Sequence, residues 1–142
     1  MNLRGPLTRL ELLACMFLLV AVGFVAMVLL RDVRSSPERR NDTRSEDVRS
    51  LGKAFTLYAL EHGGRYPEGV STEEKMVCQD AAASCTGMLD VRPLIPRYLE
   101  RIPADPFAVG VHETFYTVRR DGKHIIVAAP YAEGGAVIQV EE

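Results

Sequence analysis

Three histidines and three cysteines are the side chains in this sequence best suited to chemistry. His62, His112 and His124 stand far apart, at a predicted helix end, in a loop and in a strand, and none has the short spacing of a metal site. The sequence also has no Gly-x-Ser-x-Gly turn, no phosphate-binding loop and no haem attachment site. We therefore expect a protein that is not an enzyme and needs no cofactor.

Two of the cysteines lie close together in the sequence. Cys78 and Cys85 bracket Gln-Asp-Ala-Ala-Ala-Ser, which separates them too widely for a Cys-x-x-Cys redox or zinc motif. In an oxidising compartment they would close a small disulfide ring that stabilises the fold by about 2 to 3 kcal/mol. In a reducing compartment they would remain two free thiols. Cys15 lies in a separate apolar segment, so it does not compete for the pairing.

That apolar segment, near the N-terminus, has one carboxylate at its edge. Residues 12–30 carry no charge, and as an α-helix they would span about 28 Å, close to the roughly 30 Å of a membrane's hydrocarbon core. Glu11 stands directly before this run, and Arg9 precedes Glu11 by two residues. A carboxylate in this position costs little free energy at the polar interface, but it needs a counter-charge if apolar helices enclose it. The sequence thus predicts a membrane helix whose Glu11 is either interfacial or paired.

The chain beyond position 30 is long enough for one small globular domain. Val48, Leu51 and Phe55 recur at three- and four-residue steps, which predicts an amphipathic helix over residues 37–62. Pro37 suits the first turn of that helix, because its missing N–H has no helical partner there. We expect the apolar stripe to pack in the domain core.

Charged residues cluster at the start of this predicted helix. We expect most of them to be solvated or paired between subunits; they are Glu38, Arg39, Arg40, Asp42, Arg44 and Asp47. Arginines are more numerous just after the apolar run than before it, which by the positive-inside rule favours a cytoplasmic C-terminal domain. Beyond position 30 the charge is mixed and weakly acidic, so we expect no nucleic-acid partner.

Two turns with proline frame the middle of the chain. Gly64-Arg65-Tyr66-Pro67 ends the helix and leads into extended backbone, and residues 68–88 are polar and predicted to be a variable loop. In Ile102-Pro103-Ala104-Asp105-Pro106 the prolines fix the backbone, and the aspartate can accept hydrogen bonds from nearby amides. The residues expected to shape the two turns are Gly64, Tyr66, Pro67, Pro103, Asp105 and Pro106.

The C-terminal part of the chain is typical of an antiparallel sheet. Residues 114–119 and 123–129 are strand-like and flank Arg120-Asp121-Gly122, which indicates a hairpin. A third strand is predicted over residues 136–140. Three antiparallel strands within residues 114–140, laid across the amphipathic helix, would bury both apolar faces, so we expect an α+β fold.

The order of these features resembles the type IV pilins and the type II secretion pseudopilins. The family's N-terminal signature, a glycine followed by Phe-Thr-Leu-Ile-Glu-Leu-Leu, is matched by Leu7, Thr8, Leu10, Glu11, Leu12 and Leu13. The Tyr-Pro turn and the Ile-Pro-x-Asp-Pro element match two later landmarks, so the resemblance covers nearly the whole chain. It implies a pilin-like fold in which a long N-terminal spine helix, transmembrane and then amphipathic, packs against the C-terminal sheet. The implied parts are a leader-like segment (1–6), a membrane or filament-core helix (7–30) and a globular domain (31–142).

The resemblance also implies a function, which is assembly into a type IV pilus or a pseudopilus through the apolar helix. In the family, the glutamate at the position of Glu11 compensates the N-terminal amine of an adjacent subunit, which prepilin peptidase creates by cutting after a glycine. Here that position holds Pro6, with Gly5 one residue earlier, so a mature chain beginning at Leu7 and an uncut chain both remain open. In an uncut chain, Arg9 of a neighbouring subunit is a substitute partner for Glu11.

The implied partners are copies of this chain, other pilins or pseudopilins, prepilin peptidase, an inner-membrane assembly platform, and lipid before assembly. The resemblance places the chain in the bacterial inner membrane as a single-pass protein with an extracytoplasmic domain, against the charge count. Some major pseudopilins hold calcium in a C-terminal loop, which makes Asp121 and Glu133 candidate calcium ligands. The alternative is a signal-anchored extracytoplasmic binding domain that does not polymerise.

Overall fold

The structure is a computed structural model that describes residues 9–34, 36–110 and 112–142. The leader-like segment 1–6, with Gly5 and Pro6, and also Leu7 lie outside the described residues. The chain divides into two compact units, residues 1–36 and 37–142, and each is described separately.

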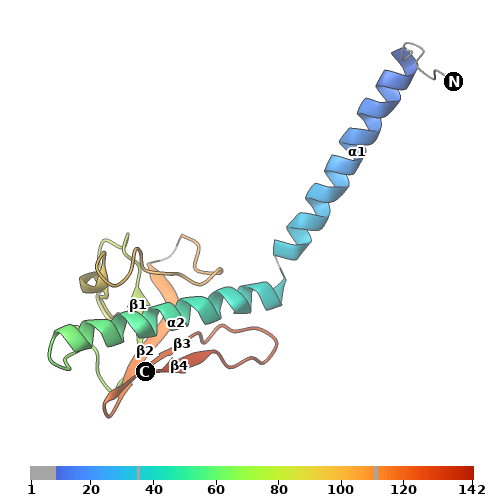
Figure 1. Cartoon of the computed structure of the whole chain (residues 1–142). Helices are drawn as coiled ribbons and strands as arrows, with labels where there is room; N and C mark the ends of the chain where they lie inside the picture. Colours follow the sequence, from blue (N-terminus) through green and yellow to red (C-terminus); the bar gives the residue numbers. More distant parts are fainter. Residues whose placement is uncertain (1–8, 35, 111) are drawn as a thin grey trace. The chain divides into compact units, whose positions relative to one another are not determined.

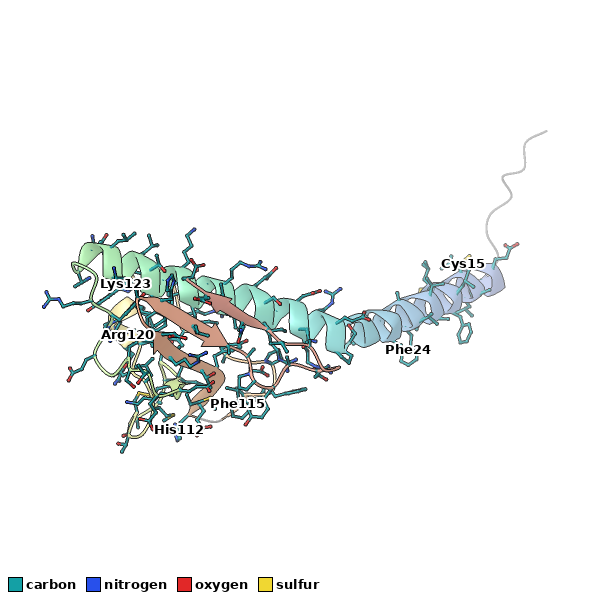
Figure 2. All side chains as sticks on the ribbon, turned by 90° about the horizontal axis from the view of Figure 1, so that it is seen from below. Cys15, Phe24, His112, Phe115, Arg120 and Lys123 are labelled. Atoms are coloured by element: carbon teal, nitrogen blue, oxygen red, sulfur yellow. A yellow bond between two sulfur atoms is a disulfide. The ribbon has the colours of Figure 1, made fainter. Side chains whose placement is uncertain are left out.

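The first unit is built on one apolar helix, α1 (Arg9–Arg34). Its side chains from Leu12 to Val28 are exposed, and the exposed fractions of Phe17 and Phe24 are 77% and 67%. Phe24 and Cys15 project from the helix in Figure 2. The stretch Glu11–Val28 is long and apolar enough to cross a membrane, so α1 can serve as a membrane anchor or a signal sequence.

The second unit begins with helix α2 (Pro37–Glu61), which ends one residue before the predicted limit. Val48, Leu51 and Phe55 are buried, so the predicted stripe faces the core. The helix ends where the backbone turns left-handed at Gly63 and Gly64, with φ of 65° and 81°. This conformation favours glycine because it has no Cβ.

Four strands form the sheet of this unit, where three were predicted. They are β1 (Lys75–Cys78), β2 (Glu113–Asp121), β3 (His124–Ala128) and β4 (Gln139–Glu141), in the order β1-β2-β3-β4, with every neighbouring pair antiparallel. The prediction was wrong for β1, which lies inside the segment expected to be a loop. Four residues are too few to display an alternating pattern, and the partner strand follows more than thirty residues later in the chain.

The core lies between α2 and the sheet, and α2 packs against β3 and β4 (Figure 1). A short 3₁₀ helix, η1 (Arg92–Leu94), adds the buried Leu94 to this core. Gly52 permits the close approach of β4, because a Cβ at this position would lie 2.8 Å from Val140 Cγ1. The disulfide predicted between Cys78 and Cys85 is present and ties β1 to the loop that follows it.

Candidate functional site

The first turns of α2 hold a buried ion pair that fixes one of the predicted turns. Arg44 is fully buried, and the exposed fraction of Asp105 is 3%. Arg44 Nε donates to Asp105 Oδ2 at 2.6 Å, and Arg44 Nη2 donates to Asp105 Oδ1 at 3.1 Å. This two-point geometry matches the planar guanidinium to the carboxylate and raises the pKa of Arg44, with the bond to Asp105 as the largest cause.

Asp105 also organises its own turn, between Pro103 and Pro106. Its Oδ1 accepts a hydrogen bond from the backbone amide of Phe107 at 2.8 Å, the kind of contact expected of this side chain. Its own amide donates to the carbonyl of Thr114 at 2.9 Å. The turn is therefore fastened both to α2 and to β2.

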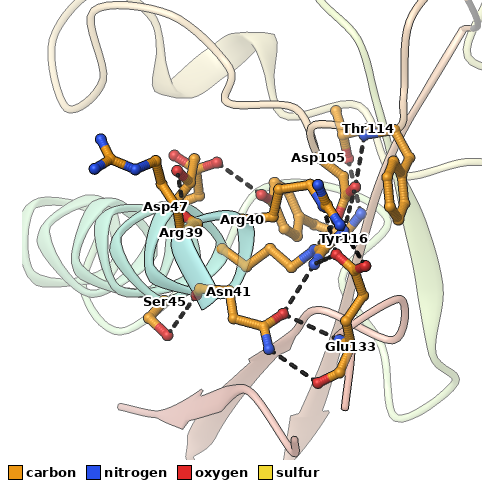
Figure 3. A network of polar contacts seen from close by, with 12 residues as sticks. Arg39, Arg40, Asn41, Ser45, Asp47, Asp105, Thr114, Tyr116 and Glu133 are labelled. Carbon is orange, nitrogen blue, oxygen red and sulfur yellow. Dashed lines mark hydrogen bonds and ion pairs between the residues drawn. The ribbon is translucent and has the colours of Figure 1, made fainter. Parts of the chain in front are cut away.

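A second carboxylate, Glu133, closes the network from the loop before β4. Arg40 donates to its two carboxylate oxygens from Nε and Nη2, each at 2.6 Å, and Arg44 Nη1 donates at 3.0 Å. Asn41 exchanges two hydrogen bonds with the Glu133 backbone, at 2.9 and 3.0 Å. Arg40, Asn41 and Glu133 are labelled in Figure 3. The bonds from Arg40 and then Arg44 lower the pKa of Glu133 to about 2.

A third contact joins the middle of this region. The hydroxyl of the buried Tyr116 donates to Asp47 Oδ2 at 2.7 Å (Figure 3). Burial is the main cause that raises the pKa of both side chains. The expectation that the charged run at the start of α2 is solvated or paired between subunits was therefore wrong for Arg40, Arg44 and Asp47, which bind partners in their own domain. Their partners lie 61 to 93 residues away in the sequence, where local spacing gives no signal.

The two candidate calcium ligands, Asp121 and Glu133, have different surroundings. Glu133 is bound by Arg40 and Arg44, whereas the exposed Asp121 ends β2 at the hairpin, 3.6 Å from Arg119. Within residues 9–34, 36–110 and 112–142, there is no group of three or more histidine, cysteine or acidic side chains that could hold a metal ion. The structure thus gives Glu133 a structural role in fastening its loop to α2.

The other predicted turn packs its tyrosine against the core. The Tyr66 ring meets Phe55 edge-on at 6.5 Å between centroids, and its hydroxyl donates to the Lys123 carbonyl at 3.1 Å. Pro67 is buried beside it, and Gly64 donates its amide to the carbonyl of Ala59 at the helix end. The turn joins the end of α2 to the β2–β3 hairpin.

A groove of about 590 Å³ opens beside this turn, at the C-terminal end of α2. Its apolar wall includes Leu60 and Tyr66, and its other wall carries Arg120, Lys123 and His124 from the hairpin. Arg120 and Lys123 project from the hairpin in Figure 2. Glu142 also lines the groove, so its walls carry apolar, basic and acidic side chains together.

The predicted assembly residues lie in the first turn of α1. Arg9 and Glu11 are both exposed, and Leu7 lies outside the described residues. Glu11 thus lies at the start of a helix whose side chains from Leu12 to Val28 are exposed in the part of the chain that the structure describes. A carboxylate in the first turn of such a helix can form an ion pair with a positively charged group of a neighbouring chain if the helices bundle.

Comparisons with protein-family models, curated proteins and solved structures found no match. The resemblance to pilins and pseudopilins therefore depends on the residues of this chain alone. The geometry described above adds that the buried core residues of the second unit all come from that unit.

Proposed function

We propose that this chain is a structural subunit of a type IV pilus-like or type II secretion pseudopilus-like filament. The observation that carries the proposal is α1, a 26-residue helix with an apolar, exposed surface and Glu11 in its first turn. The second unit has its own buried core, so α1 is not required to complete that core. A helix of this kind has its apolar surface available for lipid or for identical helices.

Assembly in this proposal is a transfer of α1 from the inner membrane into a bundle of identical helices. Inside such a bundle a carboxylate needs a counter-charge, because burial of a lone ion is strongly unfavourable. The counter-charge for Glu11 is the N-terminal amine of a neighbour if the chain is cut to begin at Leu7, or Arg9 of a neighbour if it is not. Head-to-tail contacts between copies then extend without closing, which produces a filament. An assembly platform and other pilin-like subunits are the proposed partners.

An extracytoplasmic location for the second unit is part of the proposal. The disulfide between Cys78 and Cys85 supports it, because structural disulfides persist in oxidising compartments. The arginines after α1 favour the opposite orientation, so the location requires a direct test. Modification of Lys123, which is exposed, by a membrane-impermeant amine reagent in intact spheroplasts would support an outward domain. Protection of the domain until the membrane is lysed would refute it.

The assembly role is tested by Glu11→Ala, with Glu38→Ala as a matched control from the first turn of α2. We expect Glu11→Ala to leave the circular dichroism of the purified chain unchanged and to remove it from the sheared filament fraction of cells. Glu38→Ala is expected to leave the filament yield unchanged. A normal filament yield for Glu11→Ala would contradict the proposed role.

The second candidate function is an anchored binding domain that does not polymerise. Pro6 at the position of the family's cleavage glycine favours it, as does the groove lined by Arg120 and Lys123. The intact mass of the chain isolated from cells separates the two candidates first. A chain that begins at Leu7 supports filament assembly, whereas an uncut chain found only as membrane monomers supports the anchored domain.

A further inference from the structure

Apolar side chains gather on the surface beside the first turns of α2. We define the aromatic surface as Phe107, Val109, Phe115 and Tyr131. The exposed fractions are 49% for Phe107, 83% for Val109 and 48% for Tyr131, while Phe115 is half-buried. Two loops and one strand supply these side chains, since Phe107 and Val109 precede β2, Phe115 lies in β2 and Tyr131 follows β3.

The Phe115 end of this surface is created by unusual backbone. Phe115 has φ of 63°, in the left-handed region that aromatic residues rarely adopt. The register between β1 and β2 shifts at this point, because Met76 pairs with Thr117 while Cys78 pairs with Glu113. The resulting bulge sets the Phe115 ring 4.7 Å from the Tyr131 ring, and Phe115 is labelled in Figure 2. Backbone strain of this kind clusters at functional sites.

The Phe107 end is held by the buried ion-pair network. The guanidinium carbons of Arg40 and Arg44 lie 5.1 and 4.9 Å from the centre of the Phe107 ring. The same arginines bind Glu133, which follows Tyr131 by two residues. The network thus fixes the Phe107 turn and the Tyr131 loop against the same two turns of α2.

The position of the aromatic surface in the chain suggests its occupant. α1 ends at Arg34 and α2 begins at Pro37, so three Cα steps, at most about 11 Å, join the two helices. Arg40 is in the first turn of α2, whereas Leu60 lies about 30 Å further along the same helix. The aromatic surface therefore lies at the end of the domain that is tethered most closely to α1.

We propose that the aromatic surface docks on the lipid headgroup interface while α1 is inserted in the membrane, before assembly. This proposal rests on the membrane insertion of α1 that the proposed function assumes. Tyr131 suits the headgroup interface, because its ring is apolar and its hydroxyl is polar, and the exposed Phe107 and Val109 can bury apolar surface there. The sequence places Arg31, Arg34 and Arg39 on either side of the tether, and clusters of basic residues beside a membrane helix are attracted to anionic lipid headgroups. Docking would hold the domain against the bilayer, and this contact would be lost when the subunit leaves the membrane.

Tryptophan fluorescence tests this, because the chain has no tryptophan of its own. Phe107→Trp, Leu60→Trp and Phe24→Trp are placed one at a time in the full chain, with a single copy per lipid nanodisc. Each disc contains phosphatidylethanolamine and phosphatidylglycerol brominated near the headgroup end of the acyl chains, which quench tryptophan on contact. Leu60→Trp is the matched control, because Leu60 is 73% exposed at the far end of α2.

We expect the variants at Phe24 and Phe107 to lose most of their emission in brominated discs and the variant at Leu60 to keep it. Quenching at Phe24 without quenching at Phe107 would overturn the docking proposal and leave membrane insertion intact. Absence of quenching at Phe24 would overturn both. If the emission of the Phe107→Trp variant changes only when several copies share a disc, docking would also be overturned. That result would identify the surface as a contact between copies. Val109→Trp repeats the test if Phe107→Trp does not fold.

Discussion

Arg44→Met tests how much the buried ion pair contributes to the second unit. The substitution keeps most of the side-chain volume but leaves Asp105 buried without its counter-charge, since Asp105 is 3% exposed and Arg44 supplies both of its charged contacts. Removing one partner of a buried pair destabilises a protein by about 3 to 5 kcal/mol. The expected loss is thus a large fraction of the roughly 5 to 15 kcal/mol that stabilises a typical domain.

The assay is urea unfolding of the full chain in detergent micelles, followed by circular dichroism. Arg49→Met is the matched control, because Arg49 is exposed on the same helix, and it should change the free energy of unfolding by no more than about 0.5 kcal/mol. The double variant Arg44→Met with Asp105→Asn removes the stranded charge, so its loss should be smaller than the sum of the single losses by about 0.5 to 3 kcal/mol. An Arg44→Met loss no larger than that of the control, or strict additivity in the double variant, would refute the reasoning.

Two further predictions concern the same unit. The pKa of Glu133 is lowered from 4.5 to about 2 in the fold, so its ionised form contributes stability above pH 4.5 that is lost as the pH falls toward 2. As the pH is lowered from 4.5 toward 2, the Tm of Glu133→Gln should therefore decrease less steeply than the Tm of the unaltered chain. Identical slopes would contradict the assigned role. Gly52→Ala places a Cβ 2.8 Å from Val140 Cγ1, so differential scanning calorimetry should show a lower Tm despite the higher helix propensity of alanine. A raised Tm would contradict this prediction and would mean that β4 shifts to accommodate the methyl group without loss of packing.

Local patterns in the sequence predicted much of this fold. The three- and four-residue steps of Val48, Leu51 and Phe55 located α2, and the strand-like runs around Asp121 located the β2–β3 hairpin. The turn itself is Gly122-Lys123, one residue later than the turn residues suggested. Both elements are visible because the periodic pattern of each helix or strand, and the backbone hydrogen bonds within it or across its hairpin, involve residues that are close in sequence.

Long-range contacts were the part that the sequence did not predict. The strand β1 has only four residues and depends on β2 for its hydrogen bonds, so it carries no pattern of its own. Arg44 belongs to a run of charges whose usual environment is solvent, and its burial depends on Asp105, 61 residues away. The left-handed backbone at Phe115 likewise follows from the bulge opposite β1.

The central claim is that α1 contacts identical helices when the subunit is in use. Its most direct test is a photoreactive phenylalanine derivative placed at Phe17 in living cells, with the same group at Leu57 of α2 as the control. Phe17 is 77% exposed within the first unit, so the probe disturbs no packing there. The account predicts that irradiation yields a ladder of cross-linked multimers from Phe17 in the sheared filament fraction. Cross-links from Phe17 to lipid alone, with the chain always monomeric, would contradict it.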